Sequence, residues 1–520
     1  DALAAQARLA LRGAADRAAA LGSHEQAGRF LEQALEVTTD PIEEAELLER
    51  AGTAASNAGR HEHADRLLVR AVEARRATGS PLDVAQALTA QAYALLNNYH
   101  TELTIGLLEP AWTELAPFAS EPAVIALGAQ LARAYFLKED HARAIAVADR
   151  VLAAAEQQQL APIVADTLIT KGTSIGYLGR PTEGRALVAA GTQEAEAHGL
   201  TVTLLRGRIN LGTIQASYSP SEAIETSRAG LEVASRYGFR SQGYILLANA
   251  AEFAISTGEW EWARASLLEA LSGPIDPGDR WPLLSTAALL EALRGDPRVL
   301  LDELVRDFGS ATDQALVVSL ELARAYRCLS EGQLAEAHDR FRSNSIGSSV
   351  NAQLAVPMAA RASLWTRNEA AAVDDLAAFN ASAMRGSVLD IERQDITAGI
   401  EALRQRRREA IASYRDVLRG WRSLRLPWNE ALTGLGMVIL LGPSDPEVVA
   451  VADTTRDILV RLEARPFLAR LDEAIAGEAA LAQARGAGPS ANGSTDPGRP
   501  AGRRIERVSA EASDGSATGS

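Results

Sequence analysis

The sequence predicts an all-α fold: an α-solenoid, wound as a right-handed superhelix of about twelve helical hairpins. A pattern of small and apolar residues recurs every 37 to 40 residues along most of the 520-residue chain. Apolar residues make up 47% of the chain but aromatic residues only 5%, and the apolar residues are mostly Ala and Leu. This composition favours closely packed helices over a β-sandwich, which needs Val, Ile, Tyr and Phe. Stacked hairpins bury a continuous core that one hairpin cannot bury alone.

The first two units define the repeat. Each has a helix, a turn glycine and a second helix, and the turn glycines are Gly22 and Gly59. Small or apolar residues then follow at fixed offsets, namely Ala27, Leu31 and Ala34 in the first unit and Ala64, Leu68 and Ala71 in the second. Steps of four and three place these residues on one helix face. A turn glycine can adopt positive φ and end the first helix.

The same frame continues along the chain. Its expected turn positions are Gly22, Gly59, Tyr99, Glu139, Gly179, Tyr218, Gly258, Gly295, Gly332, Asn368, Gln405 and Gly442. The segment "TGEWEWARASLLEAL" is a clear copy, with Ala263, Leu267 and Ala270 on the packed face. Around Tyr99, Tyr218 and Gly295 the frame depends on spacing more than on residue type.

Two composition changes suggest a division of the chain. "LSGPIDPGDRWP" (271–282) holds three prolines and two glycines and reads as a longer connection. We therefore expect an N-terminal solenoid over 1–271 and a C-terminal solenoid over 283–476 that continues the array. Residues 477–520 are rich in Gly, Ser, Ala and Pro without apolar periodicity, so we expect a disordered tail.

The order of small residue, turn glycine, Ala, large apolar residue and Ala resembles the tetratricopeptide repeat (TPR), over roughly residues 1–476. The units here run slightly longer than the family's nominal 34 residues. The resemblance implies that the first helix of each hairpin lines a concave groove. It places these residues in the groove: Tyr93, Asn97, Gln130, Arg133, Phe136, Thr173, Tyr177, Arg208, Gln215, Asn249 and Glu252. Such amide, arginine and aromatic groups suit an extended peptide; ordinary surface polarity is the alternative. The lysine and asparagine set of the family's peptide-carboxylate clamp is not reproduced.

The segment "TKGTSIGYLGRPTEGRALVAAG" (170–191) combines Lys171 with several glycines and superficially suggests a phosphate-binding loop. A P-loop needs G-x-x-x-x-G-K-[ST] between a strand and a helix, whereas Lys171 here precedes the glycines. Within the repeat frame, Gly172, Gly179, Gly184 and Gly191 all occupy small-residue positions. We therefore expect these glycines to serve helix packing.

No other motif predicts catalysis or metal binding. His61 and His63 lie two residues apart, but two histidines do not complete a tetrahedral site. These two, like His24, His100 and His141, lie near turns and are expected to be exposed. Cys328 is expected to be a buried core thiol. We expect no cofactor, no metal site and no enzymatic activity.

The charge pattern disfavours nucleic acid as a partner. The net charge is −15 and the isoelectric point is near 5.1, so the chain has no long-range attraction for phosphates. The basic segment from Leu403, with Arg404 to Arg408, Tyr414, Trp421 and Trp428, also fits the repeat frame, and either a binding or a packing role is open. One cysteine and no long apolar run indicate a cytoplasmic protein without a membrane span.

Several segments resemble a class of bacterial regulators. They are "ITKGTSIGYLGRPTEGRAL", "LRGRINLG", "LANAAEFAISTGEWEWA" and "LPWNEALTGLGMVILLGPSDPEV". In that class a TPR region accompanies an AAA/STAND-type ATPase and either a class III adenylate or guanylate cyclase or, in LuxR-type regulators, a DNA-binding module. The chain opens at Asp1 inside a helical pattern, so we read it as a fragment. The resemblance implies a non-catalytic interaction or sensor region that binds a protein, peptide or ligand and regulates an attached cyclase–ATPase module. A LuxR-type regulator and a stand-alone peptide adaptor are the alternatives.

Overall fold

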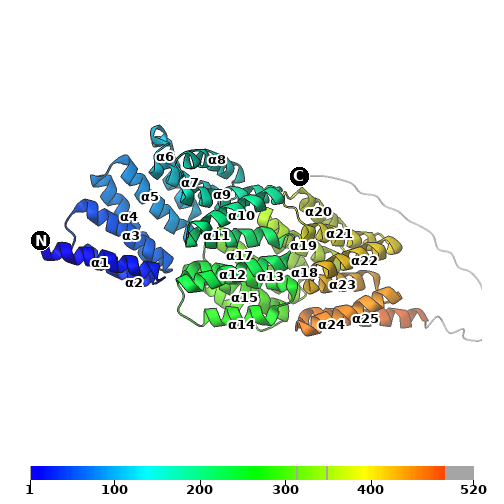
Figure 1. Cartoon of the computed structure of the whole chain (residues 1–520). Helices are drawn as coiled ribbons and strands as arrows, with labels where there is room; N and C mark the ends of the chain where they lie inside the picture. The colour runs from blue at the N-terminus through cyan, green and yellow to red at the C-terminus, as the bar shows by residue number, and fades with distance from the viewer. Residues whose placement is uncertain (1, 312–313, 347–348, 487–520) are drawn as a thin grey trace, which may run out of the picture.

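The chain forms a long stack of antiparallel helical hairpins (Figure 1). The computed structural model describes residues 2–311, 314–346 and 349–486, and every regular element in these ranges is helical. Helices α1 to α24 pair into twelve hairpins, and α25 (Arg465–Gly486) packs against the last of them. This confirms the predicted α-solenoid of TPR-like hairpins.

The first helix of each hairpin carries an odd number. These helices are α1 (Ala2–Ala20), α3 (Pro41–Asn57), α5 (Pro81–Asn97), α7 (Pro122–Leu137), α9 (Ala161–Tyr177), α11 (Thr201–Ala216), α13 (Arg240–Thr257), α15 (Pro277–Arg294), α17 (Gln314–Ser330), α19 (Ser349–Trp365), α21 (Ser387–Leu403) and α23 (Pro427–Leu441).

The second helix of each hairpin carries an even number. These helices are α2 (His24–Glu36), α4 (His61–Thr78), α6 (Thr101–Glu114), α8 (His141–Gln157), α10 (Pro181–Ala197), α12 (Pro220–Tyr237), α14 (Trp260–Leu271), α16 (Val299–Phe308), α18 (Leu334–Asn344), α20 (Glu369–Ala381), α22 (Arg407–Leu424) and α24 (Pro446–Arg461). A short 3₁₀ helix, η1 (Ala116–Phe118), follows α6.

Most expected turn residues adopt positive φ. They include Tyr99 (φ 62°), Glu139 (φ 61°) and Gln405 (φ 62°), although none of these is a glycine. Two expected positions, Asn368 and Tyr218, do not adopt positive φ. Arg367 rather than Asn368 has positive φ, and Asn368 instead caps α20 by accepting a hydrogen bond from the Ala371 amide. Tyr218 has no positive φ, because the α11–α12 turn closes through the Ser219 amide and the Gln215 carbonyl.

Glycines bring α9 and α10 into close backbone contact. A Cβ on Gly184 would lie 2.5 Å from the Gly172 carbonyl oxygen and 2.7 Å from the Gly176 amide nitrogen. A Cβ on Gly191 would lie 2.6 Å from the Ala165 carbonyl oxygen. The glycines of residues 170–191 therefore pack helices, as the repeat frame predicted.

Successive turns of the superhelix touch one another. Hairpin turns contact chain segments that follow five or six hairpins later: Gly22 meets Tyr237 and Gly238, Gly179 meets Ala383, Gly258 meets Pro427, and Gly295 meets Pro466. Backbone hydrogen bonding supports these contacts, since the Val388 amide donates to the Ser217 carbonyl (3.1 Å). Adjacent turns of the superhelix are therefore in contact, and the first helices of the hairpins face the inside of the superhelix.

The sequence-based boundaries differ from the helix ends in two places. Pro277 starts α15 and Pro282 lies inside it, so the connection after α14 spans only residues 272–276. Helix α15 packs against both α13 and α14; the division of the array into 1–271 and 283–476 stays a prediction. Helix α25 runs to Gly486, because "GEAALAQAR" (477–485) is rich in strong helix formers. The rest of the expected tail, residues 487–520, lies outside the described residues.

Within the described ranges, we find no helix that combines the length and the apolar character needed to cross a bilayer.

Candidate functional site

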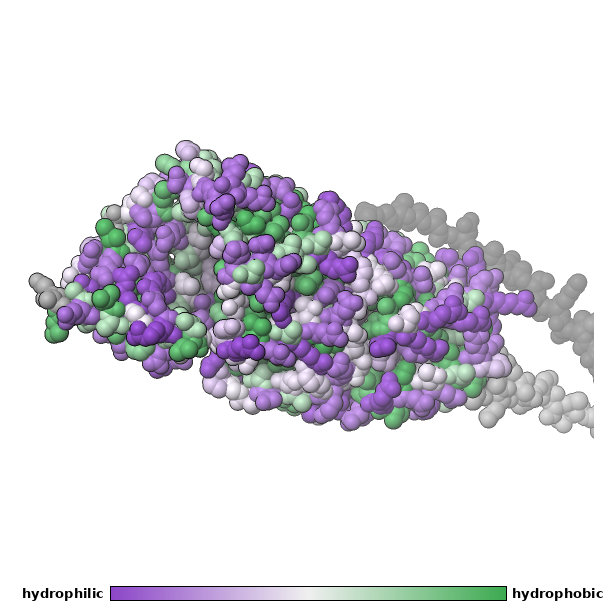
Figure 2. Space-filling view, viewed as in Figure 1, coloured by the Kyte–Doolittle hydropathy of each residue, from purple (hydrophilic) through white to green (hydrophobic). Residues whose placement is uncertain are grey.

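Three cavities follow one another along the odd-numbered helices, and α2 also lines the first of them. Their volumes are about 730, 470 and 250 Å³, and they are called here the N-terminal, central and C-terminal cavities. The first two share Tyr93 and Gln130 in their walls, and the last two share Thr213 and Asn249. Figure 2 shows the molecule hollowed between its N-terminal hairpins and the rest of the array. The cavities together form one inner channel.

A spacing of 80 residues, two repeats, relates side chains of α7 and α11 in the central cavity. Ala126, Ala129, Gln130 and Arg133 of α7 and Arg206, Ile209, Asn210 and Thr213 of α11 line it with the same internal spacing. A spacing of one repeat aligns hydrogen bonds between neighbouring first helices. Tyr93 donates to Asn57 (2.9 Å), and Arg133, forty residues later, donates to Asn97 (2.9 Å).

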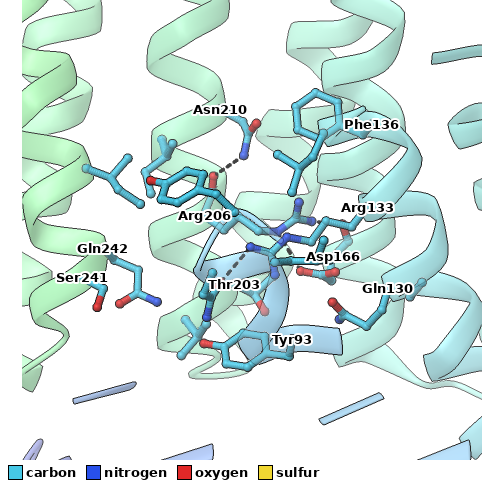
Figure 3. Close-up of a pocket in the computed structure, with 18 of the residues that line it drawn as sticks. Tyr93, Gln130, Arg133, Phe136, Asp166, Thr203, Arg206, Asn210, Ser241 and Gln242 are labelled. Atoms are coloured by element: carbon cyan, nitrogen blue, oxygen red, sulfur yellow. Dashed lines mark hydrogen bonds and ion pairs between the residues drawn. The ribbon is translucent and has the colours of Figure 1, made fainter. Parts of the chain in front are cut away.

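Two arginines and one carboxylate meet in the central cavity (Figure 3). Arg206 Nε lies 2.8 Å from Asp166 Oδ1, and Arg206 also donates to the Asp166 carbonyl and to Thr170 Oγ1. Asn210 in turn donates to the Arg206 carbonyl oxygen (2.8 Å). Asp166 therefore forms its ion pair with Arg206, while Arg133 feels the Asp166 charge only at longer range.

Arg133 has no carboxylate within ion-pair distance among the described residues. Its guanidinium donates to Asn97 and lies 5.9 Å from the Tyr93 ring centroid. Burial, together with repulsion from Arg206, lowers the pKa of Arg133 to about 10, so it stays protonated at neutral pH. A partly buried cation that faces a cavity attracts an anionic group.

Acceptor oxygens in the same cavity lack partners. They are Gln130 Oε1, Asp166 Oδ2 and Gln242 Oε1, and no described residue donates to any of them. Buried polar atoms are normally hydrogen-bonded in folded proteins. Gln242 reaches the cavity from α13, opposite Gln130 on α7 (Figure 3). Donors such as the amides of an extended peptide would satisfy these oxygens.

An aromatic cluster closes one side of the central cavity. The rings of Phe136 and Tyr177 are 5.9 Å apart, and His141 lies 5.5 Å from Tyr177. Burial lowers the pKa of His141, whose two ring nitrogens have no described partner. The cluster gives this wall a rigid, largely apolar surface.

The structure brings most of the sequence-predicted groove residues together. The central cavity contains Tyr93, Asn97, Gln130, Arg133, Phe136, Tyr177 and Asn249, and the C-terminal cavity contains Glu252 as well as Asn249.

Three predicted groove residues lie elsewhere. Thr173 is fully buried and donates to the Ile169 carbonyl (2.7 Å). Gln215 accepts a hydrogen bond from Thr226 of α12 (2.8 Å), and Arg208 packs near Gly230 of the same helix. The predicted placement in the groove is wrong for these three residues. For the two on α11 the cause is the turn position, which the sequence analysis assigned to Tyr218. A 40-residue step from Gly179 assigns that turn position to Ser219 instead.

Sequence reasoning missed several polar residues of the central cavity, among them Asp166, Arg206, Asn210 and Gln242. The signal for two of them was present. Two 40-residue steps from Ala126 and Gln130 lead to Arg206 and Asn210. The Asp166–Arg206 ion pair joins equivalent positions of α9 and α11.

The structure also places the residues of the rejected sites. Lys171 Nζ lies 2.6 Å from Asp149 on α8, away from the channel. His61 forms a hydrogen bond with Asp279 (3.2 Å) and His63 forms one with Glu32 (2.9 Å), so the two histidines have separate partners. No cluster of three or more metal-binding side chains occurs among the described residues. Cys328 is buried, as predicted.

The expected exposure of the turn histidines is mostly wrong. His24, His61 and His141 are buried, and only His100 is exposed. The reason is that hairpin turns pack against other parts of the array. His24, for example, stacks on Phe239 with ring centroids 4.5 Å apart.

The basic segment after Leu403 is largely paired within the molecule. Arg404 bonds to Glu369 (2.7 Å), Arg415 to Glu447 (2.8 Å) and Arg422 to Glu430 (2.6 Å). The aromatic residues Tyr414, Trp421 and Trp428 are buried in the core. These contacts favour a packing role for the segment.

No known protein family and no curated protein matches the sequence. Several solved structures are similar in fold. A Rap protein complexed with competence and sporulation factor is 14% identical, with a TM-score of 0.44 over 65% of this chain and 88% of that chain. Yeast Tom70 is 13% identical, with a TM-score of 0.31 over 92% and 97%. Cut9 of the APC/C Cut9–Hcn1 heterotetramer is 11% identical, with a TM-score of 0.31 over 89% and 96%.

The fold and the channel together define a class of protein. The chain is a TPR-like helical-repeat protein, with an inner channel lined mainly by the first helices of its hairpins.

Proposed function

We propose that the chain binds an extended peptide segment in its inner channel. The observation that carries this proposal is the set of unpartnered polar groups along one continuous channel. Gln130 Oε1 and Gln242 Oε1 lack donors, and Arg133 lacks an ion-pair partner among the described residues. An extended peptide supplies backbone amides for the former and an acidic side chain or terminus for the latter.

A random peptide library displayed on phage tests this function. We expect wild-type chain to enrich peptides that carry an acidic residue. Arg133→Met should weaken the selected peptides by at least about tenfold, because a charge-assisted hydrogen bond is lost.

The matched control is Arg208→Met, which removes an arginine outside the channel. We expect it to leave binding unchanged. No enrichment on the wild-type chain, or loss of binding in Arg208→Met but not in Arg133→Met, would contradict the proposal.

We propose further that the chain is the interaction and sensor region of a larger cytoplasmic bacterial regulator, attached to a cyclase–ATPase module. The resemblance of the four segments quoted above and the single cysteine support this context. A LuxR-type regulator with a DNA-binding module is the second candidate, and a stand-alone adaptor the third. Reading the gene beyond both ends of this sequence distinguishes them, because each candidate has a different neighbouring module or none.

A further inference from the structure

The C-terminal cavity has a mainly apolar wall, and two of its three charged residues are carboxylates. Its wall comes mainly from the odd-numbered helices α11 to α23, with Pro220 of α12, and its charged lining residues are Glu252, Arg361 and Glu392. Asp395 lies behind Arg361. Arg361 Nη2 lies 2.6 Å from Glu392 Oε2 and 3.1 Å from Asp395 Oδ2. One guanidinium thus already serves two carboxylates.

Glu252 is the third carboxyl group, and it has no partner. It makes no hydrogen bond or ion pair with any described residue, and its side chain faces the cavity from α13. Burial alone raises its pKa to about 7. A carboxylate in this setting is destabilised unless a cation approaches it.

Asn429 supplies an independent observation. Its side chain is 8% exposed and lines the same cavity from α23. Its Nδ2 donates to Glu392 Oε1 (3.0 Å), which fixes the orientation of the amide, and its Oδ1 has no donor among the described residues. An acceptor this deeply buried normally has a partner.

We propose that the C-terminal cavity is a binding site for one cationic group, an alkylammonium or a guanidinium. Such a group donates to the Glu252 carboxylate and to Asn429 Oδ1 and compensates the excess negative charge. The volume of about 250 Å³ is below the range of about 300–1,000 Å³ typical of drug-sized ligands, and suits a single basic side chain or a small amine. The site adjoins the central cavity through Thr213 and Asn249, so a peptide in the channel can place a basic residue here. That version of the inference rests on the proposed function; a free amine does not require it.

Isothermal titration calorimetry with three probes tests the site. They are agmatine, a blocked glycine peptide with one central arginine, and the same peptide with citrulline, which replaces the guanidinium by a neutral urea. We expect agmatine, the arginine peptide or both to bind, and the citrulline peptide to bind at least about tenfold more weakly. Binding of the peptide alone identifies a basic side chain as the ligand, and equal binding of agmatine identifies a free amine or guanidine.

Glu252→Gln keeps the shape of the side chain and removes the charge. We expect it to weaken the cationic probe by at least about tenfold, while Glu232→Gln, an exposed change on α12, has no effect. Wild-type affinity should also rise between about pH 6 and about pH 8, because binding requires the ionised carboxylate, and Glu252→Gln should lose this dependence. Circular dichroism verifies that both variants fold.

Three results would overturn the site: no binding of any probe, equal affinity for the citrulline peptide, or unchanged affinity in Glu252→Gln. The peptide library separates this failure from failure of the proposed function. Selected peptides without a basic residue, together with no binding of agmatine, refute the cation site and leave the channel as a peptide site. Agmatine binding without any selected peptide supports the cation site and refutes the proposed peptide binding.

Discussion

At the scale of single residues, the channel contains charged side chains that suit a ligand but reduce the stability of the folded protein. Arg133 and Glu252 form no ion pair with the described residues, and their pKa values are lowered to about 10 and raised to about 7 respectively. Strongly perturbed groups that line a cavity are common at functional sites. Most other buried charges are paired, such as Arg75 with Glu49 (2.7 Å).

Glu252→Gln is predicted to stabilise the protein in a pH-dependent way. The folded-state pKa of Glu252 is raised from 4.5 to about 7, so the folded protein binds more protons than the unfolded one in that window. Wild-type stability therefore falls as the pH rises from about 4.5 to about 7, and the variant lacks this loss. We expect little difference at about pH 4.5 and a gain of about 1–2 kcal/mol at about pH 8, after allowance for partial solvation of the carboxylate.

Urea unfolding of wild-type protein and variant at the two pH values measures this effect. Equal stabilities at pH 8 would show that Glu252 is well solvated or paired. That result would remove the energetic argument for a cation at the C-terminal cavity.

At the scale of helices, the sequence pattern was sufficient to predict the hairpins. It was not sufficient to predict, for every helix, which side chains face the channel. The spacing of small residues identified the turns, even where Tyr99, Glu139 and Gln405 replace glycine. It failed for α11, because the poorly matching unit around Tyr218 left a one-residue ambiguity in the frame. A helix turns by about 100° per residue, so small register errors move side chains such as Arg208 out of the channel.

Gly184→Ala is predicted to destabilise the α9–α10 hairpin. The new Cβ would lie 2.5 Å from the Gly172 carbonyl oxygen, and backbone atoms cannot move aside as a flexible side chain would. We expect a loss of about 2–4 kcal/mol in the free energy of unfolding. Gly106→Ala in α6 is the matched control, because nothing lies within 4 Å of its Cβ position, and it should gain about 0.5–1 kcal/mol from helix propensity. Thermal unfolding compares the two, and equal effects would show that α9 and α10 do not pack this closely.

At the scale of the whole molecule, contacts between superhelical turns convert an open array into a closed channel. Asp279 of α15 accepts hydrogen bonds from Ser241 of α13 (2.8 Å) and bonds to His61 of α4 (3.2 Å), and all three side chains are buried. Residues 61 and 279 lie far apart in the sequence. Such contacts follow from small rotations summed over several hairpins, which residue patterns within one repeat do not specify.

Asp279→Ala is predicted to loosen this closure. It leaves His61 and Ser241 without their buried partner, at a cost of about 2–4 kcal/mol. Burial lowers the pKa of His61, but the hydrogen bond and charge of Asp279, with a smaller effect of Asp276, outweigh it and raise the pKa. The contribution of protonated His61 is therefore fully present below about pH 6.5 and is lost as the pH rises through the raised pKa.

Small-angle X-ray scattering and urea unfolding measure the two consequences. The variant should have a larger radius of gyration, and its stability deficit should be greater at about pH 6 than at about pH 9. Glu62→Ala, an exposed change on α4, is the control. An unchanged radius and a pH-independent deficit would show that the contact does not hold the turns together.

A crystal structure of the chain with the tightest peptide from the library tests the central claim most directly. We predict that the peptide lies in the inner channel, with an acidic group on Arg133, its backbone amides on Gln130 and Gln242, and a basic group within about 3 Å of Glu252 and Asn429. A peptide bound on the outer, even-numbered helices, with the channel free of it, would contradict the account.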